Sequence, residues 1–343
     1  MKKHVNIPVF IPHLGCPNQC VFCNQRSITG REKFDPESVV RIIDEALSTV
    51  SEDTETEIAF FGGSFTGIDY DLMCRLLEIA YSYVKSGRVS SIRCSTRPDY
   101  ISEKILDTLQ HYGVKVIELG LQSVDSLVLD TTKRGHSFDA EKNAVNLIKK
   151  HGFSFVGQMM IGLPGSDLEK EKETARFICE SKADGARVYP TVVFRDTELC
   201  LMAEKGEYTP LSTEDAVFRT AEVLKIFASY GVKVIRVGLC ASENLSSPDA
   251  YYAGPNHSAL GELCENRVFY SLIYEKLTVM SPKVGATVTV KVPRGSVSKA
   301  VGQKKNNKLR LISEFSLKDI SFVEEDHLKG YEVECEERKN KCT

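Results

Sequence analysis

Three cysteines near the start of the chain have the spacing of a metal site. They are Cys16, Cys20 and Cys23, in the stretch GCPNQCVFCNQ. Iron–sulfur clusters are usually held by four thiolates, and structural zinc sites normally close with four protein ligands. Three thiolates so close together therefore imply either a fourth ligand from elsewhere or a position left open for chemistry.

Zinc and an iron–sulfur cluster are the two alternatives for this trio. His13 is the nearest further donor that could complete a zinc site, but zinc modules usually present two close pairs of ligands, and no second pair accompanies the trio. The spacing favours a cluster in which one iron is not bound by protein and is free to bind a small molecule. The remaining cysteines are scattered, and we expect buried thiols rather than disulfides.

The composition is that of an ordinary globular protein. Of 343 residues, 42% are hydrophobic and 27% are charged. No run of 18 apolar residues predicts a transmembrane helix, and prolines break the apolar stretch that follows the first lysines, unlike a signal-peptide core. We therefore expect a cytoplasmic protein with no membrane partner.

Apolar runs and amphipathic stretches alternate over the first two-thirds of the chain. This alternation predicts parallel strands joined by helices, and Gly113, Gly152 and Gly231 are expected to end helices in the left-handed conformation. About six such repeats could form a partial barrel or an open doubly wound sheet. The apolar runs are residues 5–12, 56–61, 91–95, 114–121, 153–162, 185–193 and 232–238.

The residues that stand out lie directly after successive apolar runs. The cysteine loop follows the first run, GGSFTG (62–67) the second, and STRPDY (95–100) the third. A site assembled from the carboxyl ends of every strand is typical of barrels. We therefore predict an α/β fold in which residues 1–240 form a partial (β/α)6-type barrel.

Residues 241–343 are expected to form a small α+β domain. Turn-forming residues at 241–258 indicate a linker, and a helix near 257–277 should precede two strands and short helices. The last dozen residues read as a solvated tail.

Residues 281–313 hold eight basic side chains and no acid. Such a run suits phosphate neutralisation, and a merely solvated basic face is the alternative. The sequence GQKK at 302–305 weakly resembles the loop of a KH domain, which clamps single-stranded RNA. The candidate RNA-binding residues are Lys304, Lys305, Lys308 and Arg310.

Several motifs in this order resemble the radical S-adenosylmethionine enzymes. They are CPNQCVFC after the first run, FFGGSF after the second and GLPG after the fifth. STRPD, IELGLQSVDSLVLDTTKRGH and DGARVYPTVVFRDTEL are similar to the radical domain of the Elongator catalytic subunit and its bacterial relatives. The resemblance covers residues 4–240.

The resemblance implies the cofactors and the reaction. Cys16, Cys20 and Cys23 would hold a 4Fe–4S cluster whose free iron chelates S-adenosylmethionine. An electron from a low-potential donor of the flavodoxin or ferredoxin type would then cleave the cofactor to a 5′-deoxyadenosyl radical.

The resemblance also implies roles for further residues. The cofactor-binding set contacts the adenine, amino, ribose and carboxylate groups, and consists of Phe22, Gly62, Gly63, Ser64, Ser95, Gln122 and Arg134. Ser64 and Ser95 stand where the family often has an acid. Arg97 and Tyr189 are the candidate catalytic residues. The structural alternatives are that Arg97 pairs with Asp99, that Gln122 is a satisfied buried amide, that Tyr189 is core, and that Arg134 and His136 solvate a helix start.

Three functions compete on this sequence. The leading one is radical modification of tRNA or another RNA. The second is radical chemistry on a small molecule such as a tetrapyrrole, as in oxygen-independent coproporphyrinogen oxidases. The third is a non-catalytic RNA-binding iron–sulfur protein. About a hundred residues after 240 leave no room for Elongator's acetyltransferase domain, so we do not expect its acetyl transfer.

Overall fold

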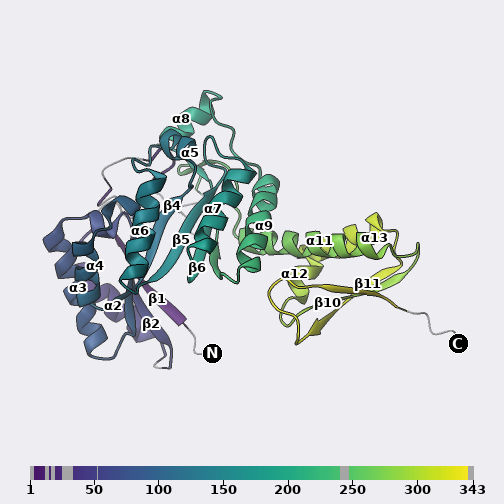
Figure 1. Cartoon of the computed structure of the whole chain (residues 1–343), viewed down its shortest axis with the longest axis horizontal. Coiled ribbons are helices and arrows are strands. Elements are labelled where there is room, and N and C mark those ends of the chain that lie inside the picture. Colours follow the sequence, from purple (N-terminus) through teal and green to yellow (C-terminus); the bar gives the residue numbers. More distant parts are fainter. Residues whose placement is uncertain are drawn as a thin grey trace.

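Seven parallel strands form the main sheet of the protein (Figure 1). The computed structural model describes residues 4–11, 15–16, 20–24, 34–51, 53–239 and 247–338. The order across the sheet is β1-β2-β3-β4-β5-β6-β8, so each strand lies beside the next along the chain. The strands are β1 (His4–Ile11), β2 (Glu55–Gly62), β3 (Ser91–Thr96), β4 (Val114–Gln122), β5 (Ser154–Ile161), β6 (Gly185–Pro190) and β8 (Val234–Val237). Each predicted apolar run coincides with one of them.

Helices connect the strands, and most of them start at a side-chain cap. Asp69, Ser102, Ser137, Asp167 and Ser212 each accept a hydrogen bond from a first-turn amide, which satisfies a donor that the helix itself leaves open. The main connecting helices are α2 (Ser38–Thr49), α3 (Tyr70–Lys85), α4 (Glu103–His111), α6 (Phe138–Lys150), α7 (Leu168–Glu180) and α9 (Thr213–Ser229). The shorter α5 (Ser126–Thr131) follows β4, and α8 (Glu198–Glu204) lies between β6 and α9.

Helix ends follow the glycine prediction. Gly113, Gly152 and Gly231 have φ values of 74°, 77° and 71°, and each lies just past a helix. Because glycine has no Cβ, it adopts this left-handed turn without strain.

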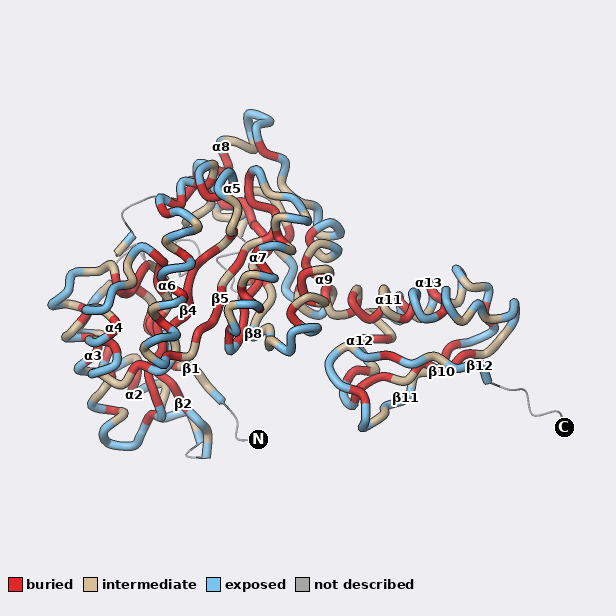
Figure 2. Tube along the Cα trace, in the orientation of Figure 1, coloured by how far each residue is buried: buried red, intermediate tan, exposed pale blue. Residues whose placement is uncertain are grey.

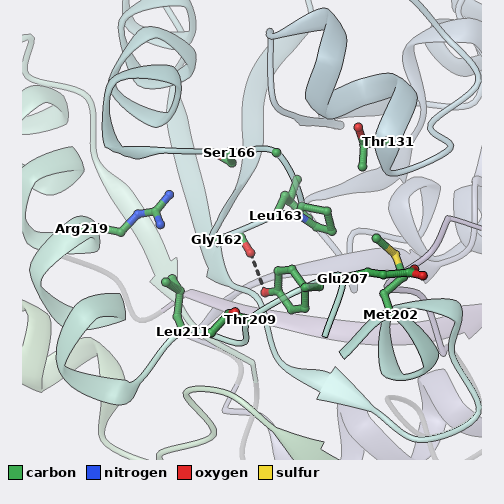
Figure 3. Close-up of a pocket in the computed structure, with 12 residues that line it drawn as sticks. Thr131, Gly162, Leu163, Ser166, Met202, Glu207, Thr209, Leu211 and Arg219 are labelled. Atoms are coloured by element: carbon green, nitrogen blue, oxygen red, sulfur yellow. Dashed lines mark hydrogen bonds between the residues drawn. The ribbon is translucent and has the colours of Figure 1, made fainter. Parts of the chain in front are cut away.

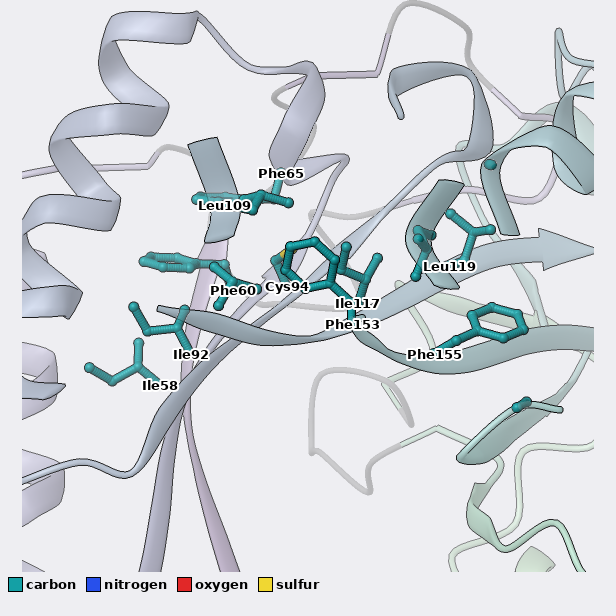
Figure 4. Packing of buried hydrophobic residues seen from close by; sticks show 14 of the residues in the cluster. Ile58, Phe60, Phe65, Ile92, Cys94, Leu109, Ile117, Leu119, Phe153 and Phe155 are labelled. Atoms are coloured by element: carbon teal, nitrogen blue, oxygen red, sulfur yellow. The ribbon is translucent and has the colours of Figure 1, made fainter. Parts of the chain in front are cut away.

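The main core lies on one face of the sheet. Alternate strand residues such as Ile58, Phe60 and Ile117 pack with α3 and α4 residues such as Leu109 in one buried cluster (Figure 4). Charged residues of the same strands, such as Glu118, project from the opposite face because strand side chains alternate. A doubly wound sheet would carry helices on both faces. Helices on one face, with β1 and β8 left as unpaired edges, confirm the partial barrel.

A second, smaller core belongs to the C-terminal α+β region (Figure 2). Its strand β10 pairs in parallel with β11 and antiparallel with β12. The elements are α11 (Leu260–Met280), β10 (Thr287–Pro293), α12 (Val297–Val301), α13 (Asn306–Glu314), β11 (Asp319–Glu325) and β12 (Glu334–Glu337). The predicted solvated tail is therefore wrong for residues 334–337, which pair with β10.

Helix α11 belongs to both cores. Its first half, including Cys264 and Val268, packs on α9 residues such as Leu224. Its second half, including Ile273 and Leu277, packs on β10. The division at residue 240 stays a prediction, since one helix joins the barrel to the C-terminal sheet.

The segment expected to be a linker contains a strand. β9 (Tyr251–Ala253) pairs antiparallel with β7 (Val193–Phe194), which follows β6. The linker prediction is wrong for these residues, while residues 240–246 lie outside the described chain. Among the described residues, no helix is long and apolar enough to span a lipid bilayer.

Candidate active site

The described end of the cysteine loop is bonded to segments that follow β4 and β6. The Val21 amide donates to the Thr132 carbonyl at 3.2 Å, and the Val21 carbonyl accepts from the Leu199 amide at 2.8 Å. The side-chain amide of Asn24 donates to the Arg195 carbonyl at 3.1 Å. Phe22 is partly buried against the apolar cluster formed with α8. These contacts fix residues 20–24 above the carboxyl ends of the strands.

Two buried arginines lie beside the Cys20 thiol. Arg134 Nη1 is 3.2 Å from Cys20 Sγ, and Arg97 Nη1 is 3.9 Å from it. Desolvation raises the pKa of the Cys16 thiol, and the charges of Arg97 and Arg134 oppose that rise. Guanidinium groups at this distance stabilise thiolates, the form that binds iron.

The described residues show no convergence of three His, Cys, Asp or Glu side chains on one metal ion, and His13 lies outside the described chain. A 4Fe–4S cluster binds each thiolate through a different iron.

Arg97 forms a two-point ion pair with Asp99. Its Nε and Nη2 atoms donate to the two carboxylate oxygens at 2.9 and 3.0 Å, and Nη2 also donates to the Arg134 carbonyl. Bidentate pairs of this kind hold both side chains in one orientation. The structural alternative for Arg97 is confirmed, and its catalytic role stays a prediction.

The GGS segment after β2 lies against the end of β1. Gly62 has a φ of +110°, and a Cβ there would lie 2.9 Å from the Ile11 carbonyl oxygen. The Gly63 amide donates to the same carbonyl at 2.8 Å. Only glycine fits at Gly62 without displacing backbone.

Ser64 is engaged inside the protein. Its hydroxyl lies 2.8 Å from Thr96 Oγ1 and accepts from the Arg97 amide at 3.2 Å. Ser95 is 3.4 Å from the Gln158 side-chain amide. The hydroxyl of Ser64 thus aligns the turns after β2 and β3, and direct contact of either serine with the cofactor stays a prediction.

Two predicted cofactor-binding residues have buried polar atoms without partners. Gln122 Oε1 and Arg134 Nε make no hydrogen bond to any described residue. Gln122 also has a φ of +74° at the irregular end of β4, a strained conformation that is common at functional sites. The satisfied-amide alternative for Gln122 is therefore wrong within the described chain. A free acceptor and a free cationic donor beside Cys20 fit the hydroxyl and carboxylate groups of S-adenosylmethionine.

Sequence reasoning missed a buried ionic network below these residues. Glu118 is fully buried and accepts from Arg93 at 3.0 Å and from Gln158 at 2.9 Å. Arg187 Nε lies 2.7 Å from Glu118 Oε2, the same carboxylate oxygen that accepts from Gln158. Tyr189 lies beside Arg187, and burial raises the pKa of its hydroxyl, so Tyr189 belongs to this polar layer and not to the apolar core. The available signal was charge at alternate positions of otherwise apolar runs.

His136 and Arg134 are both buried, so the expectation that they solvate a helix start is wrong. His136 Nε2 lies 3.0 Å from a carboxylate oxygen of Glu141. Burial lowers the pKa of His136 to about 3 and raises that of Glu141 to about 9. The pair is therefore neutral at neutral pH, beneath the Arg97–Asp99 pair.

The GLPG turn after β5 lines a cavity (Figure 3) and is held by a second buried carboxylate. Glu171 accepts from the Gly162 amide at 2.6 Å and from Arg219 Nε at 2.8 Å. The Tyr208 hydroxyl donates to the Gly162 carbonyl at 2.7 Å. A cavity of about 280 Å³ lies beside this turn. These bonds give the turn a fixed position at the edge of the site.

Two family models match the chain. The radical SAM superfamily model matches residues 10–178, and the model of the radical SAM C-terminal domain matches residues 183–269. Together they span most of the chain, including the cysteine loop and every strand of the barrel after β1.

Curated relatives are about 30% identical to this chain over the stretch that aligns with it. A tRNA uridine(34) acetyltransferase of Methanocaldococcus jannaschii is 30% identical over 243 residues, covering 59% of this chain and 45% of the relative. Elongator complex protein 3 of Homo sapiens is 30% identical over 267 residues, covering 66% of this chain and 49% of the relative. The chain thus spans about half the length of these relatives.

Solved structures with a similar fold include an archaeal Elp3 of Methanocaldococcus infernus with an N-terminal deletion. It superimposes with a TM-score of 0.60 at 22% identity, over 82% of this chain and 64% of that one. Streptococcus suis SuiB bound to S-adenosylmethionine gives 0.51 at 15% identity, over 74% and 54%. At these identities the likeness concerns the fold.

The family-model matches and the partial barrel indicate the same enzyme family. A non-catalytic role is set aside, because the matching family consists of enzymes. This chain belongs to the radical SAM superfamily, whose enzymes use a 4Fe–4S cluster and S-adenosylmethionine.

Proposed function

We propose that this enzyme uses its radical chemistry to modify transfer RNA. The observation that carries the proposal is the similarity of its barrel to two tRNA uridine(34) acetyltransferases, at 30% and 31% identity. Because the chain spans less than half of each, acetyl transfer is not part of the proposal. A cytoplasmic location follows from a tRNA substrate.

The residues described above would hold the cofactors as follows. Cys16, Cys20 and Cys23 would hold the cluster, with Arg97 and Arg134 beside Cys20. The bound cluster would supply the electron, taken from a flavodoxin- or ferredoxin-type donor, for reductive cleavage of S-adenosylmethionine to methionine and a 5′-deoxyadenosyl radical.

Other residues orient the cofactor. Gln122 Oε1 would accept a hydrogen bond from a ribose hydroxyl, and Arg134 Nε would donate to the carboxylate. Gly62 and Gly63 would leave space for the amino acid moiety, and Phe22 would lie against the adenine. The polar layer of Glu118, Arg187 and Tyr189 faces the barrel interior, where it can orient a polar substrate.

The RNA contact rests on fewer lysines than the sequence indicated. Lys308 pairs with Asp319 at 2.8 Å, and Arg310 pairs with Glu314 at 3.4 Å. Other acids from outside residues 281–313 pair with Lys291, Arg294 and Lys299. Lys304 and Lys305 are exposed and have no ion pair in the described chain.

Both free lysines occupy the turn that resembles a KH loop. Lys304 and Lys305 have φ values of 50° and 62°, which are uncommon for residues other than glycine. The turn joins α12 to α13 between two parallel strands, β10 and β11. A KH-like role stays a proposal, supported by this strand–helix–helix–strand order and by the two unpaired charges.

Nucleoside analysis tests the proposal. Reconstituted enzyme is incubated anaerobically with S-adenosylmethionine, dithionite and unmodified tRNA, which is then digested and analysed by mass spectrometry. A nucleoside of new mass is expected with wild type and not with the Cys16, Cys20 and Cys23 triple alanine variant. Unchanged tRNA, together with conversion of coproporphyrinogen in a parallel reaction, would replace this proposal with the small-molecule alternative.

A further inference from the structure

A groove of about 790 Å³ is lined by residues of the barrel helix α9, of the C-terminal helix α11, and of the turn and helix α13 that follow α12. The lining residues include Phe218 of α9 and Arg267 and Tyr270 of α11, together with Lys304 of the turn before α13 and Arg310 of α13. We call it the α9–α11 groove. Its volume lies within the range of ligand-binding clefts, and the residues of the cofactor site do not line it.

Arg267 is the most unusual residue of the groove. Its guanidinium lies over two rings, 5.5 Å from the centroid of Phe218 and 5.1 Å from that of Tyr270. Arginine carries five N–H donors. In the described chain the Arg267 side chain makes no hydrogen bond or ion pair, and its Nε is buried without a partner. Stacking therefore holds the group in place while its hydrogen-bonding edge stays available for an anion.

The surrounding charges restrict where that anion can lie. Arg310 stacks on Tyr270 at 4.4 Å and donates to Glu314, so its charge is partly compensated. Glu214 and Asp215 line the α9 end of the groove. Lys304 is exposed and unpaired in the described chain. The positive end of the groove therefore lies between Arg267 and Lys304.

Apolar surface lies next to this positive end. Phe218 is 40% exposed and Leu309 is 59% exposed, although both line the groove. Aromatic faces beside phosphate-binding cations are the usual elements of single-strand binding. The next residue after Phe218, Arg219, binds Glu171 at the GLPG turn, so the groove lies one helix width from the edge of the active site.

We propose that the α9–α11 groove binds a single-stranded segment of the RNA substrate. One phosphate lies between Arg267 and Lys304, and one base stacks on Phe218. This inference rests on the proposed function, because it supplies the surface by which an RNA substrate docks beside the barrel. A free nucleotide would present the same chemistry, and the test separates the two.

The test is binding of fluorescently labelled tRNA to the cluster-containing protein, measured by anisotropy at several salt concentrations. Arg267→Gln should weaken binding about tenfold, the usual value of a charge-assisted hydrogen bond. It should also reduce the slope of log affinity against log salt by roughly 0.7. Phe218→Ala removes an exposed ring and should weaken binding about tenfold through lost base stacking.

Lys276→Gln is the matched control. Lys276 is exposed on the same helix and does not line the groove. Because its charge lies in solvent outside the proposed binding site, Lys276→Gln should change the affinity for tRNA less than twofold. Thermal unfolding verifies that each variant is folded. Because Phe218 is exposed, its variant remains informative if Arg267→Gln is destabilised.

Each outcome has one meaning. Wild type that binds tRNA, with both groove variants binding equally well, overturns the groove and leaves the proposed function intact. Wild type that binds no tRNA overturns the proposed function and this inference together. Adenosine monophosphate that binds as tightly as the RNA overturns the RNA assignment in favour of a small nucleotide site.

Discussion

Two residues near the carboxyl end of β4 have buried polar atoms that make no hydrogen bond in the described chain. A protein normally pairs its buried polar atoms, because an unpaired one costs about 1–3 kcal/mol. Gln122 Oε1 and Arg134 Nε are exceptions, and both lie in the region where Cys20 meets Arg97. Such atoms reduce the stability of the protein without its ligand and are satisfied when a ligand binds.

Replacing Gln122 by Met tests whether the unpaired oxygen of Gln122 serves ligand binding. Methionine has a similar length but no unpaired oxygen, so the cofactor-free protein should become more stable by about 1 kcal/mol. Affinity for S-adenosylmethionine should fall about tenfold, since one hydrogen bond is lost. Urea unfolding and anaerobic calorimetry measure the two effects. Gln110→Met, on the exposed surface of α4, is the control, and a variant that loses stability but keeps cofactor affinity would make Gln122 a structural residue.

The neutral His136–Glu141 pair predicts how stability depends on pH. Burial raises the pKa of Glu141 to about 9, so between the unfolded value and 9 the folded state holds a proton that the unfolded state has lost. This group's contribution therefore falls as pH rises through that window. His136, with a pKa lowered to about 3, adds the opposite trend only below its unfolded value near 6.5.

Above pH 6.5, only Glu141 of this pair still makes stability depend on pH. Wild-type melting temperature should therefore decline between pH 6.5 and 9 relative to Glu141→Gln, whose amide does not titrate. If the melting temperatures of the two proteins change equally with pH over this window, Glu141 is ionised in the folded state and the prediction is wrong.

At the scale of elements, the two faces of the sheet have different tasks. One face packs on helices, and the other carries Glu57, Arg93, Glu118 and Arg187 on neighbouring strands. Buried ion pairs add little net stability, but removing one partner leaves an uncompensated buried charge. This layer therefore constrains the strand ends on which the site is built.

Replacing Arg93 by Met should cost about 3–5 kcal/mol, because Arg93 bonds both Glu57 and Glu118. Arg88→Met is the matched control, since the Arg88–Asp44 pair is about half exposed and should contribute less than about 1 kcal/mol. Urea unfolding of the cluster-free proteins compares them. Equal losses in the two variants would mean that the network is open to solvent.

The strands and the helix ends could be predicted because their signals are local. Apolar runs, capping residues and glycines such as Gly113 act within a few positions of the chain. The ionic layer could not, because Glu118 meets Arg187 only when β4, β5 and β6 are placed side by side. The same is true of His136, whose burial depends on Glu141, and of β12, whose alternating charges read as a tail until β10 supplies its hydrogen bonds.

The candidate site was predictable in part for the same reason. Motif order predicted a site that includes Cys20, Gln122 and Arg134, and the structure brings Arg134 beside Cys20. Motif order did not show that Arg97 also lies beside Cys20, or that acids such as Glu265 and Glu336 pair with basic residues of the segment 281–313. Those are tertiary pairings between residues distant in sequence.

At the scale of the whole molecule, α11 joins the catalytic barrel to the C-terminal sheet through two apolar half-faces. An RNA bound beside this helix would reach the site over the α9 edge. The chain resembles Elongator-type relatives and spans about half their length.

Formation of 5′-deoxyadenosine by the reconstituted protein, with S-adenosylmethionine and dithionite, is the direct test of the radical chemistry. We expect that wild type forms it, that added tRNA increases the rate, and that Cys20→Ala forms none. A wild-type protein that holds four irons and forms no 5′-deoxyadenosine would contradict the radical chemistry. Formation that tRNA leaves unchanged and a tetrapyrrole accelerates would contradict the RNA substrate.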